Sequence, residues 1–174
     1  NIYKEDIYVG YRYFETFAPN EVLYPFGYGK SYTSFSITGK VREVSEKEVQ
    51  IDSEVKNTGS LAGKEVIQIY VEAPQGKLGN PRRKLVAFQK TEKLEPGESR
   101  KISFTVPKYL FASYDDCGVT GYPSAYVLEE GMYKIFAGNS VRTAEIVGKY
   151  QQEFQVMEQL ETACDPEIEF ERMY

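Results

Sequence analysis

From residue 34 onward, the chain is built from short runs in which apolar and polar residues alternate. Val49, Ile51 and Val55 alternate with polar neighbours, which is the period-two pattern of a strand with one buried face. Further strands are predicted over residues 35–41, 65–73, 85–88, 102–106, 132–137 and 143–156. The pattern therefore predicts about seven strands.

Turn-forming residues separate these runs. Asn57-Thr58-Gly59 is a turn signal, and Pro96 before Gly97 is the order that a type II turn prefers. Residues 110–114 suggest one helical turn, and no longer segment of this region has a helical period. Short strands with turns every ~8–12 residues are typical of an all-β sandwich or barrel.

The two ends of the chain differ from this strand region. Residues 1–33 are rich in Tyr, Phe, Gly and Pro without a sustained period, which predicts an irregular arm. Its aromatic and aliphatic side chains are too apolar for free solvent, so we expect them to pack along the sandwich or to form a patch where another domain docks. These side chains are Ile7, Tyr8, Tyr11, Tyr13, Phe14, Tyr24 and Phe26. Residues 157–174 are acidic and predict a connector.

The composition of the chain argues against several classes of function. The net charge of −5 argues against a nucleic-acid partner, and no apolar run is long enough to span a membrane. The chain has no His, which excludes Ser-His-Asp and Cys-His nucleophile systems and the usual zinc sites with His ligands. The one basic cluster, Arg82, Arg83 and Lys84, is interpreted as a solvated strand entrance rather than a binding patch.

Two segments invite a chemical interpretation that their details do not support. Residues 27–31 resemble a phosphate loop, but the full motif needs a Gly where Tyr24 stands, so a glycine-aromatic turn with close backbone approach is favoured. Asp115 and Asp116 are adjacent loop acids, which more often cap backbone N–H groups or stay solvated than catalyse. We therefore assign no catalytic, cofactor-binding or metal residue, and expect no cofactor.

An ordered series of motifs resembles the fibronectin type III-like domain of family 3 glycoside hydrolases. The segments that carry the resemblance are residues 7–14, 23–33, 55–59, 62–66, 68–71, 84–88, 94–99 and 131–133. Lys30 departs from the family, whose members often carry Leu at this position. The resemblance covers roughly residues 2–140.

The resemblance implies an immunoglobulin-like, fibronectin type III-like antiparallel β-sandwich over residues 34–156. Residues 1–33 would then be the arm that leads from a preceding α/β domain. We expect two sheets packed face to face, although alternation gives only the parity of each strand and not which parity faces the core. The residues assigned to the inside are Phe35, Ile37, Val55, Ile67, Ile69, Phe88, Phe104, Tyr133 and Ile135.

The resemblance also implies a function at the level of the whole enzyme. The family cleaves β-glycosidic bonds with retention, using carboxylates from a barrel domain and usually from the α/β domain. Neither segment is in this chain, so no catalytic residue is carried over. The leading hypothesis is an accessory module that packs against and stabilises the catalytic domains of the same polypeptide.

Two alternatives belong to other classes. One is an autonomous carbohydrate-binding or adhesion module, which an exposed coplanar row of aromatics would favour. The other is a self-sufficient hydrolase, which the missing barrel disfavours. For residues 157–174 we hold two hypotheses: that they lead into the barrel in a reversed domain order, or that they fold back on the sandwich.

Overall fold

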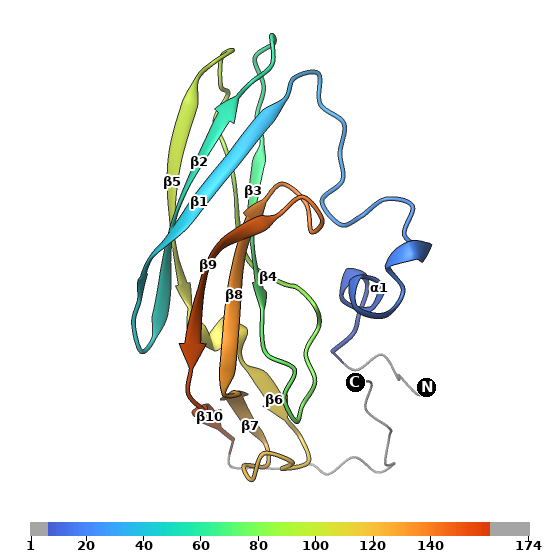
Figure 1. The fold of residues 1–174 in the computed structure, drawn as a ribbon, viewed down its shortest axis with the longest axis vertical. Helices are drawn as coiled ribbons and strands as arrows, with labels where there is room; N and C mark the ends of the chain where they lie inside the picture. The colour runs from blue at the N-terminus through green and yellow to red at the C-terminus, as the bar shows by residue number, and fades with distance from the viewer. Residues whose placement is uncertain (1–6, 161–174) are drawn as a thin grey trace.

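The computed structural model describes residues 7–160 and shows two antiparallel sheets packed face to face (Figure 1). One sheet has the order β1-β2-β5, from Phe35–Val44, Glu48–Asn57 and Ser99–Pro107. The other has the order β4-β3-β8-β9, from Lys84–Lys90, Val66–Glu72, Gly131–Gly138 and Glu145–Gln152. The predicted fibronectin type III-like β-sandwich is confirmed.

A third, smaller sheet closes the lower end of the molecule in Figure 1. It contains β10 (Gln155–Gln159), β7 (Ala125–Leu128) and β6 (Ser113–Asp115). The prediction of one final strand over residues 143–156 was therefore wrong, because Glu153 and Phe154 separate β9 from β10. The predicted helical turn at residues 110–114 lies slightly earlier, as the 3₁₀ helix η2 (Lys108–Phe111).

The main core lies between the two large sheets. Of the predicted inward residues, Val55, Ile67, Ile69, Phe104, Tyr133 and Ile135 are buried there, and Phe35 and Ile37 are half-buried against them. Phe88 was assigned wrongly, since its side chain is 69% exposed. The register of β4 shifts beside Val86, so Val86 and Ala87 both pack against the core and Phe88 faces outward with Gln68.

A second cluster covers the outer face of the four-stranded sheet. Tyr70, Phe136, Val141 and Ala144 are buried on this face, with Tyr11 of the arm packed against them. Strand β3 is consequently buried on both faces along most of its length. An antiparallel sheet normally leaves one face to solvent, so the arm accounts for this exception.

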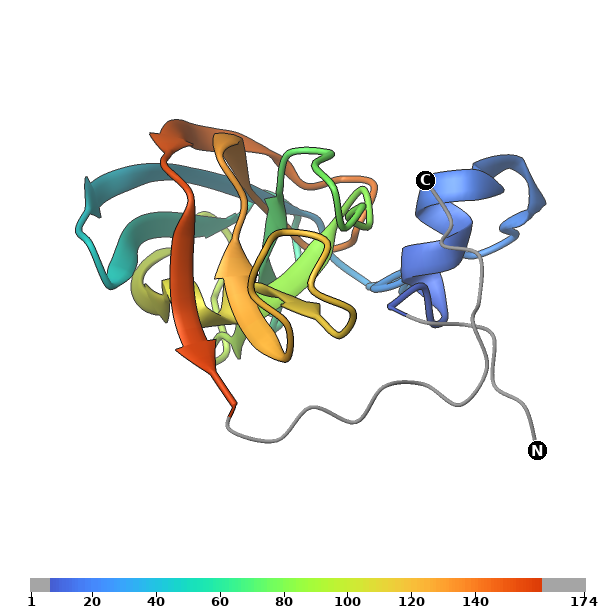
Figure 2. The same cartoon turned by 90° about the horizontal axis from the view of Figure 1, so that it is seen from below.

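The arm is not wholly irregular, because it contains a short helix. Helix α1 (Tyr11–Phe17) is followed by the 3₁₀ helix η1 (Pro19–Glu21). Viewed from below in Figure 2, α1 lies beside the sandwich and outside its layers. A helix of seven residues is too short to be stable by propensity alone, so its contacts with the sheet must hold it.

Candidate docking surface and arginine pocket

Tyr11 attaches α1 to the outer face of the sheet. Its ring stacks on Phe26 with centroids 4.5 Å apart and meets Tyr70 edge-on at 6.4 Å. Its hydroxyl oxygen accepts a hydrogen bond from the backbone N–H of Leu85 at 2.8 Å. One side chain thus combines ring packing with a polar contact to the first part of β4.

The segment that follows η1 contacts the four-stranded sheet and its loops at Phe26 and Gly27. The backbone N–H of Val141 donates to the carbonyl of Phe26 at 2.9 Å. Gly27 has a φ of +86°, and a Cβ there would lie 2.7 Å from Gln68 Nε2 and 2.8 Å from the carbonyl oxygen of Asn139. The predicted glycine turn with close backbone approach is confirmed, and a larger residue at position 27 would push the arm off the sheet.

Polar contacts complete the attachment. Arg142 Nε lies 2.9 Å from Oε1 of Glu15, and the side chain of Glu15 is only 8% exposed. Arg142 Nη2 donates to the carbonyl of Pro19 at 2.6 Å. The backbone N–H of Arg82 donates to Thr16 Oγ1 at 2.9 Å. Glu15 and Arg142 are 127 positions apart, and nothing in the sequence pattern predicts that they meet.

The opposite side of the arm is exposed and aromatic. Tyr8 is buried, as expected, whereas Leu23 is 89% and Tyr24 70% exposed. We name the exposed apolar set the arm surface: Val9, Tyr13, Phe14, Phe17, Leu23, Tyr24, Phe26, Tyr28 and Tyr32. The arm therefore packs along the sandwich through Tyr11, as predicted, and also leaves an exposed apolar set; the docking of another domain on that set stays a prediction.

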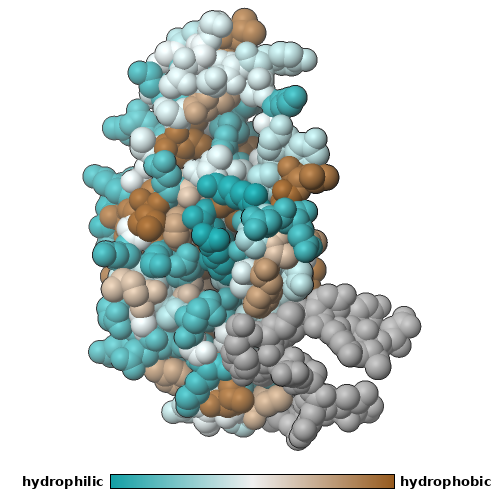
Figure 3. All heavy atoms as spheres, turned by 45° about the vertical axis from the view of Figure 1, so that its right-hand side comes forward, coloured by the Kyte–Doolittle hydropathy of each residue, from teal (hydrophilic) through white to brown (hydrophobic). Residues whose placement is uncertain are grey.

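The arm surface is aromatic rather than aliphatic, since Val9 and Leu23 are its two aliphatic members. On the face of the whole molecule seen in Figure 3, strongly hydrophobic side chains form separate spots between hydrophilic ones. Ring pairs link parts of the arm, with Tyr13 and Phe17 at 5.6 Å and Tyr24 and Tyr28 at 5.0 Å between centroids. Enrichment in Tyr and Phe beside polar groups is typical of protein interfaces that are not obligate.

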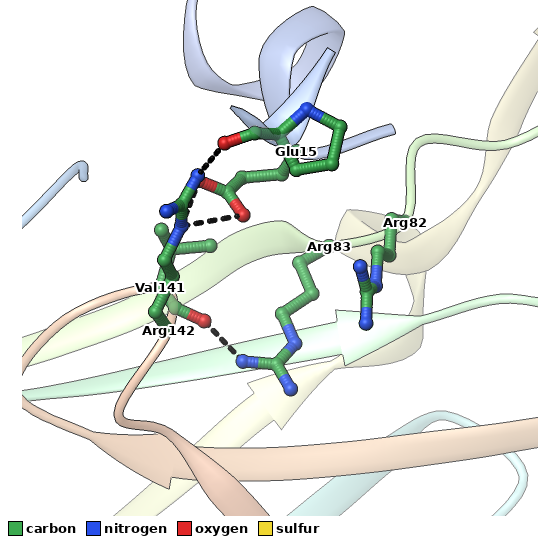
Figure 4. A pocket seen from close by; sticks show the side chains of 6 residues that line it. Glu15, Arg82, Arg83, Val141 and Arg142 are labelled. Carbon is green, nitrogen blue, oxygen red and sulfur yellow. Dashed lines mark hydrogen bonds and ion pairs between the residues drawn. The ribbon is translucent and has the colours of Figure 1, made fainter. Parts of the chain in front are cut away.

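A small pocket lies where the arm meets the sheet. It has a volume of about 190 Å³ and is lined by Glu15, Pro19, Arg82, Arg83, Val141 and Arg142 (Figure 4). Three guanidinium groups and one carboxylate therefore share a small space. The interpretation of residues 82–84 as a solvated strand entrance was wrong for two of its three members, as the next contacts show.

Arg83 and Lys84 are held by the fold and are not freely solvated. Arg83 Nη1 donates to the carbonyl of Val141, and its guanidinium lies 4.1 Å from the ring centroid of Phe136. Lys84 Nζ donates to the carbonyl of Ala112 at 3.1 Å. Only Arg82 is exposed, and its side chain has no hydrogen bond or ion pair with residues 7–160.

The adjacent loop acids do not form a catalytic pair. Asp115 is fully buried and accepts hydrogen bonds from the backbone N–H groups of Gly118, Val119 and Thr120. Burial raises the pKa of Asp115, but these hydrogen bonds, together with one from the Thr120 hydroxyl, outweigh it and hold the pKa below its usual value. The prediction that these acids cap backbone groups is confirmed for Asp115, which organises the loop before β7.

A second hollow lies at the other end of the sandwich. It has a volume of about 370 Å³, and the partly exposed rings of Tyr122 and Phe154 stack beside it with centroids 5.6 Å apart. The side chain of Glu129 at its wall is already engaged, because it accepts hydrogen bonds from the backbone N–H groups of Lys77 and Leu78. This pair is a short aromatic platform and not an extended row.

Residues 7–160 contain neither a metal-binding cluster nor a membrane-spanning helix. No group of three or more Cys, Asp or Glu in this range could hold a metal ion. Within the same range, none of the helices has the length and apolarity that a membrane crossing requires.

Comparison with known proteins places the chain within longer relatives. Residues 65–141 match the family model of the fibronectin type III-like domain. A β-glucosidase of Ruminococcus albus is 48% identical over 174 residues, which are 99% of this chain and 18% of that protein.

Solved structures of β-glucosidases share this fold. A β-glucosidase from Paenibacillus barengoltzii has a TM-score of 0.87 and 54% identity, and the matched part is 93% of this chain and 19% of the Paenibacillus chain. β-Glucosidase 3B from Thermotoga neapolitana, in complex with α-D-glucose, has a TM-score of 0.79 and 39% identity, covering 90% and 21%. The chain thus spans about a fifth of the length of these relatives.

Proposed function

Because this chain belongs to the fibronectin type III-like domains of glycoside hydrolase family 3, we propose that it is the accessory module of a β-glucosidase-type enzyme. In this proposal the arm surface packs against a catalytic domain of the same polypeptide and stabilises it. The predicted domain bounds are residues 1–33 for the arm, 34–156 for the sandwich and 157–174 for the acidic connector. The boundary at 156 is too early, because β10 (Gln155–Gln159) continues past it, and residues 161–174 lie outside the described residues.

The observation that carries the proposal is the two-sided construction of the arm. Its inner side is fixed to the sheet by Tyr11, Gly27 and Glu15, so its position is set by the sandwich. Its outer side leaves Leu23, Tyr24 and other rings partly or largely in solvent. Apolar side chains held in a fixed position without a partner are what a docking surface requires.

The test compares two equally exposed aromatic residues in the full-length gene product. Tyr24, on the arm surface, is 70% exposed, and Phe88, on the sandwich, is 69% exposed. We expect Tyr24→Ser to lower the unfolding temperature of the full-length protein by about 1 °C, because it removes about 1–2 kcal/mol of interface burial from a protein several times longer than this chain. Phe88→Ser is the matched control and should leave that temperature nearly unchanged.

The same pair in the 174-residue chain separates docking from folding. There, both substitutions should change stability little, since both side chains are already in solvent. If Tyr24→Ser and Phe88→Ser have the same effect in the full-length protein, the arm surface does not dock and the proposal fails.

The accessory role also predicts that the 174-residue chain does not hydrolyse substrate by itself. The two catalytic carboxylates that the family uses belong to other domains, and Asp115 is committed to backbone capping. Purified chain should therefore release no measurable nitrophenol from aryl β-glucosides or β-xylosides. Turnover that disappears after a point substitution within this chain would contradict the accessory role.

The Tyr122–Phe154 platform supports one second candidate, a carbohydrate-binding module. Stacked rings beside a hollow that also contains Glu130 and Lys77 could present an apolar face and polar groups to a sugar. Titration of the chain with cellobiose, followed through tyrosine resonances, tests it. Saturable shifts that Tyr122→Ala abolishes would favour this function, whereas unchanged spectra favour the docking module alone.

A further inference from the structure

We propose that the arginine pocket is a carboxylate-binding site, and that its occupant is an acidic side chain of the protein segment that docks beside α1. The identity of the occupant rests on the proposed docking function. The presence of the site does not, because it follows from the charges and geometry of this chain.

The pocket concentrates positive charge in a protein that is acidic overall. Its wall holds three arginines and one glutamate, whereas the whole chain has a net charge of −5. Glu15 is already committed, since both of its carboxylate oxygens accept from Arg142 Nε, at 2.9 and 3.2 Å. Neither Arg82 nor Arg83 therefore makes an ion pair with residues 7–160, although the charges of Glu72 and Glu15 favour the charged form of Arg83 from a greater distance.

The arginine donors are not used up by the fold. Figure 4 shows Arg82 and Arg83 side by side across the pocket from Glu15 and Arg142, with no dashed contact to Arg82. Arg83 Nε is buried and has no hydrogen-bond partner. A buried donor without an acceptor is costly, and a bound oxygen acceptor in this pocket would offset that cost.

The pocket is also preorganised. The ring of Phe136 and the carbonyl of Val141 fix the guanidinium of Arg83, and the side chain of Arg142 is fixed by Glu15 and Pro19. Donors that are already held lose little further freedom when a ligand binds. Paired guanidinium groups suit planar oxygen anions, for which arginine offers parallel N–H donors.

The location favours a side chain from a docked segment over a free metabolite. Glu15 and Pro19 belong to the arm, so the pocket lies between the arm and the sheet, next to the segment that carries the arm surface. At about 190 Å³ it is a small space, in keeping with a carboxylate group rather than a larger ligand. The burial of the aromatic rings would hold the partner on the arm, and a carboxylate bound in the pocket would fix the position in which the partner docks.

The experiment uses the 174-residue chain, with acetate as a stand-in for the side-chain carboxylate. The arginine Nε–Hε resonances are followed while sodium acetate replaces sodium chloride at constant ionic strength, up to about 0.1 M. We expect saturable shifts of the Arg82 and Arg83 signals. Arg82→Gln should weaken acetate binding about fivefold or more, because it removes one of the two charges that make no ion pair with residues 7–160.

Arg100→Gln is the matched control. Arg100 is an exposed residue of β5, on the other large sheet, and its replacement removes the same charge from the chain. Acetate binding should be unchanged in this variant. Linear, non-saturating shifts in the wild type, or equal weakening by Arg82→Gln and Arg100→Gln, would overturn the site.

Inorganic phosphate provides the second arm of the experiment. Phosphate that binds no more than about tenfold more tightly than acetate supports a side-chain carboxylate as the occupant. Much tighter phosphate binding would overturn that occupant in favour of a free phosphoryl ligand. Neither result depends on docking, which the Tyr24→Ser comparison tests separately.

Discussion

The four-stranded sheet buries both of its faces, but by different means. Its inner face packs Ile67, Ile69 and Ile135 against the three-stranded sheet, where each is fully buried. Its outer face packs Tyr70 and Phe136 against an arm that lies outside the sandwich. The inner face is thus part of the sandwich, and the outer face depends on a segment that is itself anchored at only a few points.

The difference between the two faces suggests how a domain can hold side chains in place for a partner before the partner binds. The contacts of the outer face hold α1 in one position while leaving Tyr13, Phe14 and Phe17 exposed. If the arm were loose, these rings would lose conformational freedom on docking, which would weaken association. In the proposed function, the contacts of the outer cluster therefore hold these rings in position before a partner docks.

The largest effect is expected on the inner face. Ile69→Ala should lower the free energy of unfolding by about 3–4 kcal/mol, because it leaves a cavity in the main core. Ile146→Ala, at a 58% exposed position of β9, is the control and should cost much less. Chemical denaturation monitored by circular dichroism measures both. Similar losses in the two variants would mean that the inner face is not the principal core.

The second effect is expected on the outer face. Tyr11→Ala removes the stacking on Phe26 and the acceptor for the Leu85 N–H, and should cost about 2 kcal/mol. It should also make the arm sensitive to protease while the sandwich stays intact. Tyr13→Ala changes a 37% exposed ring of the same helix and should do neither.

A clear result would contradict this view of the outer face. If protease removes the arm equally fast from the wild type and the Tyr11→Ala variant, without loss of stability in either, the arm is dispensable for the fold. The exposed rings would then not be held in position for docking.

The smallest of the stability effects depends on pH. Burial, and secondarily the charge of Arg12 on α1, lowers the pKa of Lys84 to about 8. An unfolded lysine titrates near 10.4, so between pH 8 and 10 unfolding takes up a proton and stability should rise with pH.

The measurement is the difference in unfolding free energy between pH 8 and pH 10. Wild type should gain up to about 2 kcal/mol over this window relative to Lys84→Met, which has no titrating group at this position. Equal pH profiles for the two proteins would show that Lys84 keeps an ordinary pKa, and hence that burial at the start of β4 does not desolvate it.

The inner face could be predicted from sequence because alternation specifies it. Val55, Ile67 and Ile135 each stand in a period-two run, and all three are buried. Alternation failed at Phe88, where the register shift beside Val86 reverses the parity of β4. It could not find β6 and β7 either, because strands of three and four residues are too short to show a period.

The outer face and the arginine pocket could not be predicted in the same way. Gln68 and Tyr70 look like solvent-facing residues of β3 until the arm covers them. The pocket joins Glu15, Arg83 and Arg142, which come from three distant parts of the chain. What the sequence did indicate was an apolar arm without a period. Its excess of Tyr and Phe correctly indicated a segment that packs on the sandwich, whereas a partner for its exposed side stays a prediction.

The central claim is that the arm surface is covered in the full-length protein. Hydroxyl-radical footprinting of the 174-residue chain and of the full-length gene product tests it directly, with Tyr24 and Tyr32, 70% and 96% exposed here, as reporters. Tyr122, 42% exposed at the opposite end of the sandwich, is the reference. We predict that Tyr24 and Tyr32 are modified at least severalfold more slowly in the full-length protein while Tyr122 changes little. Equal modification rates for Tyr24 and Tyr32 in the two proteins would contradict the claim.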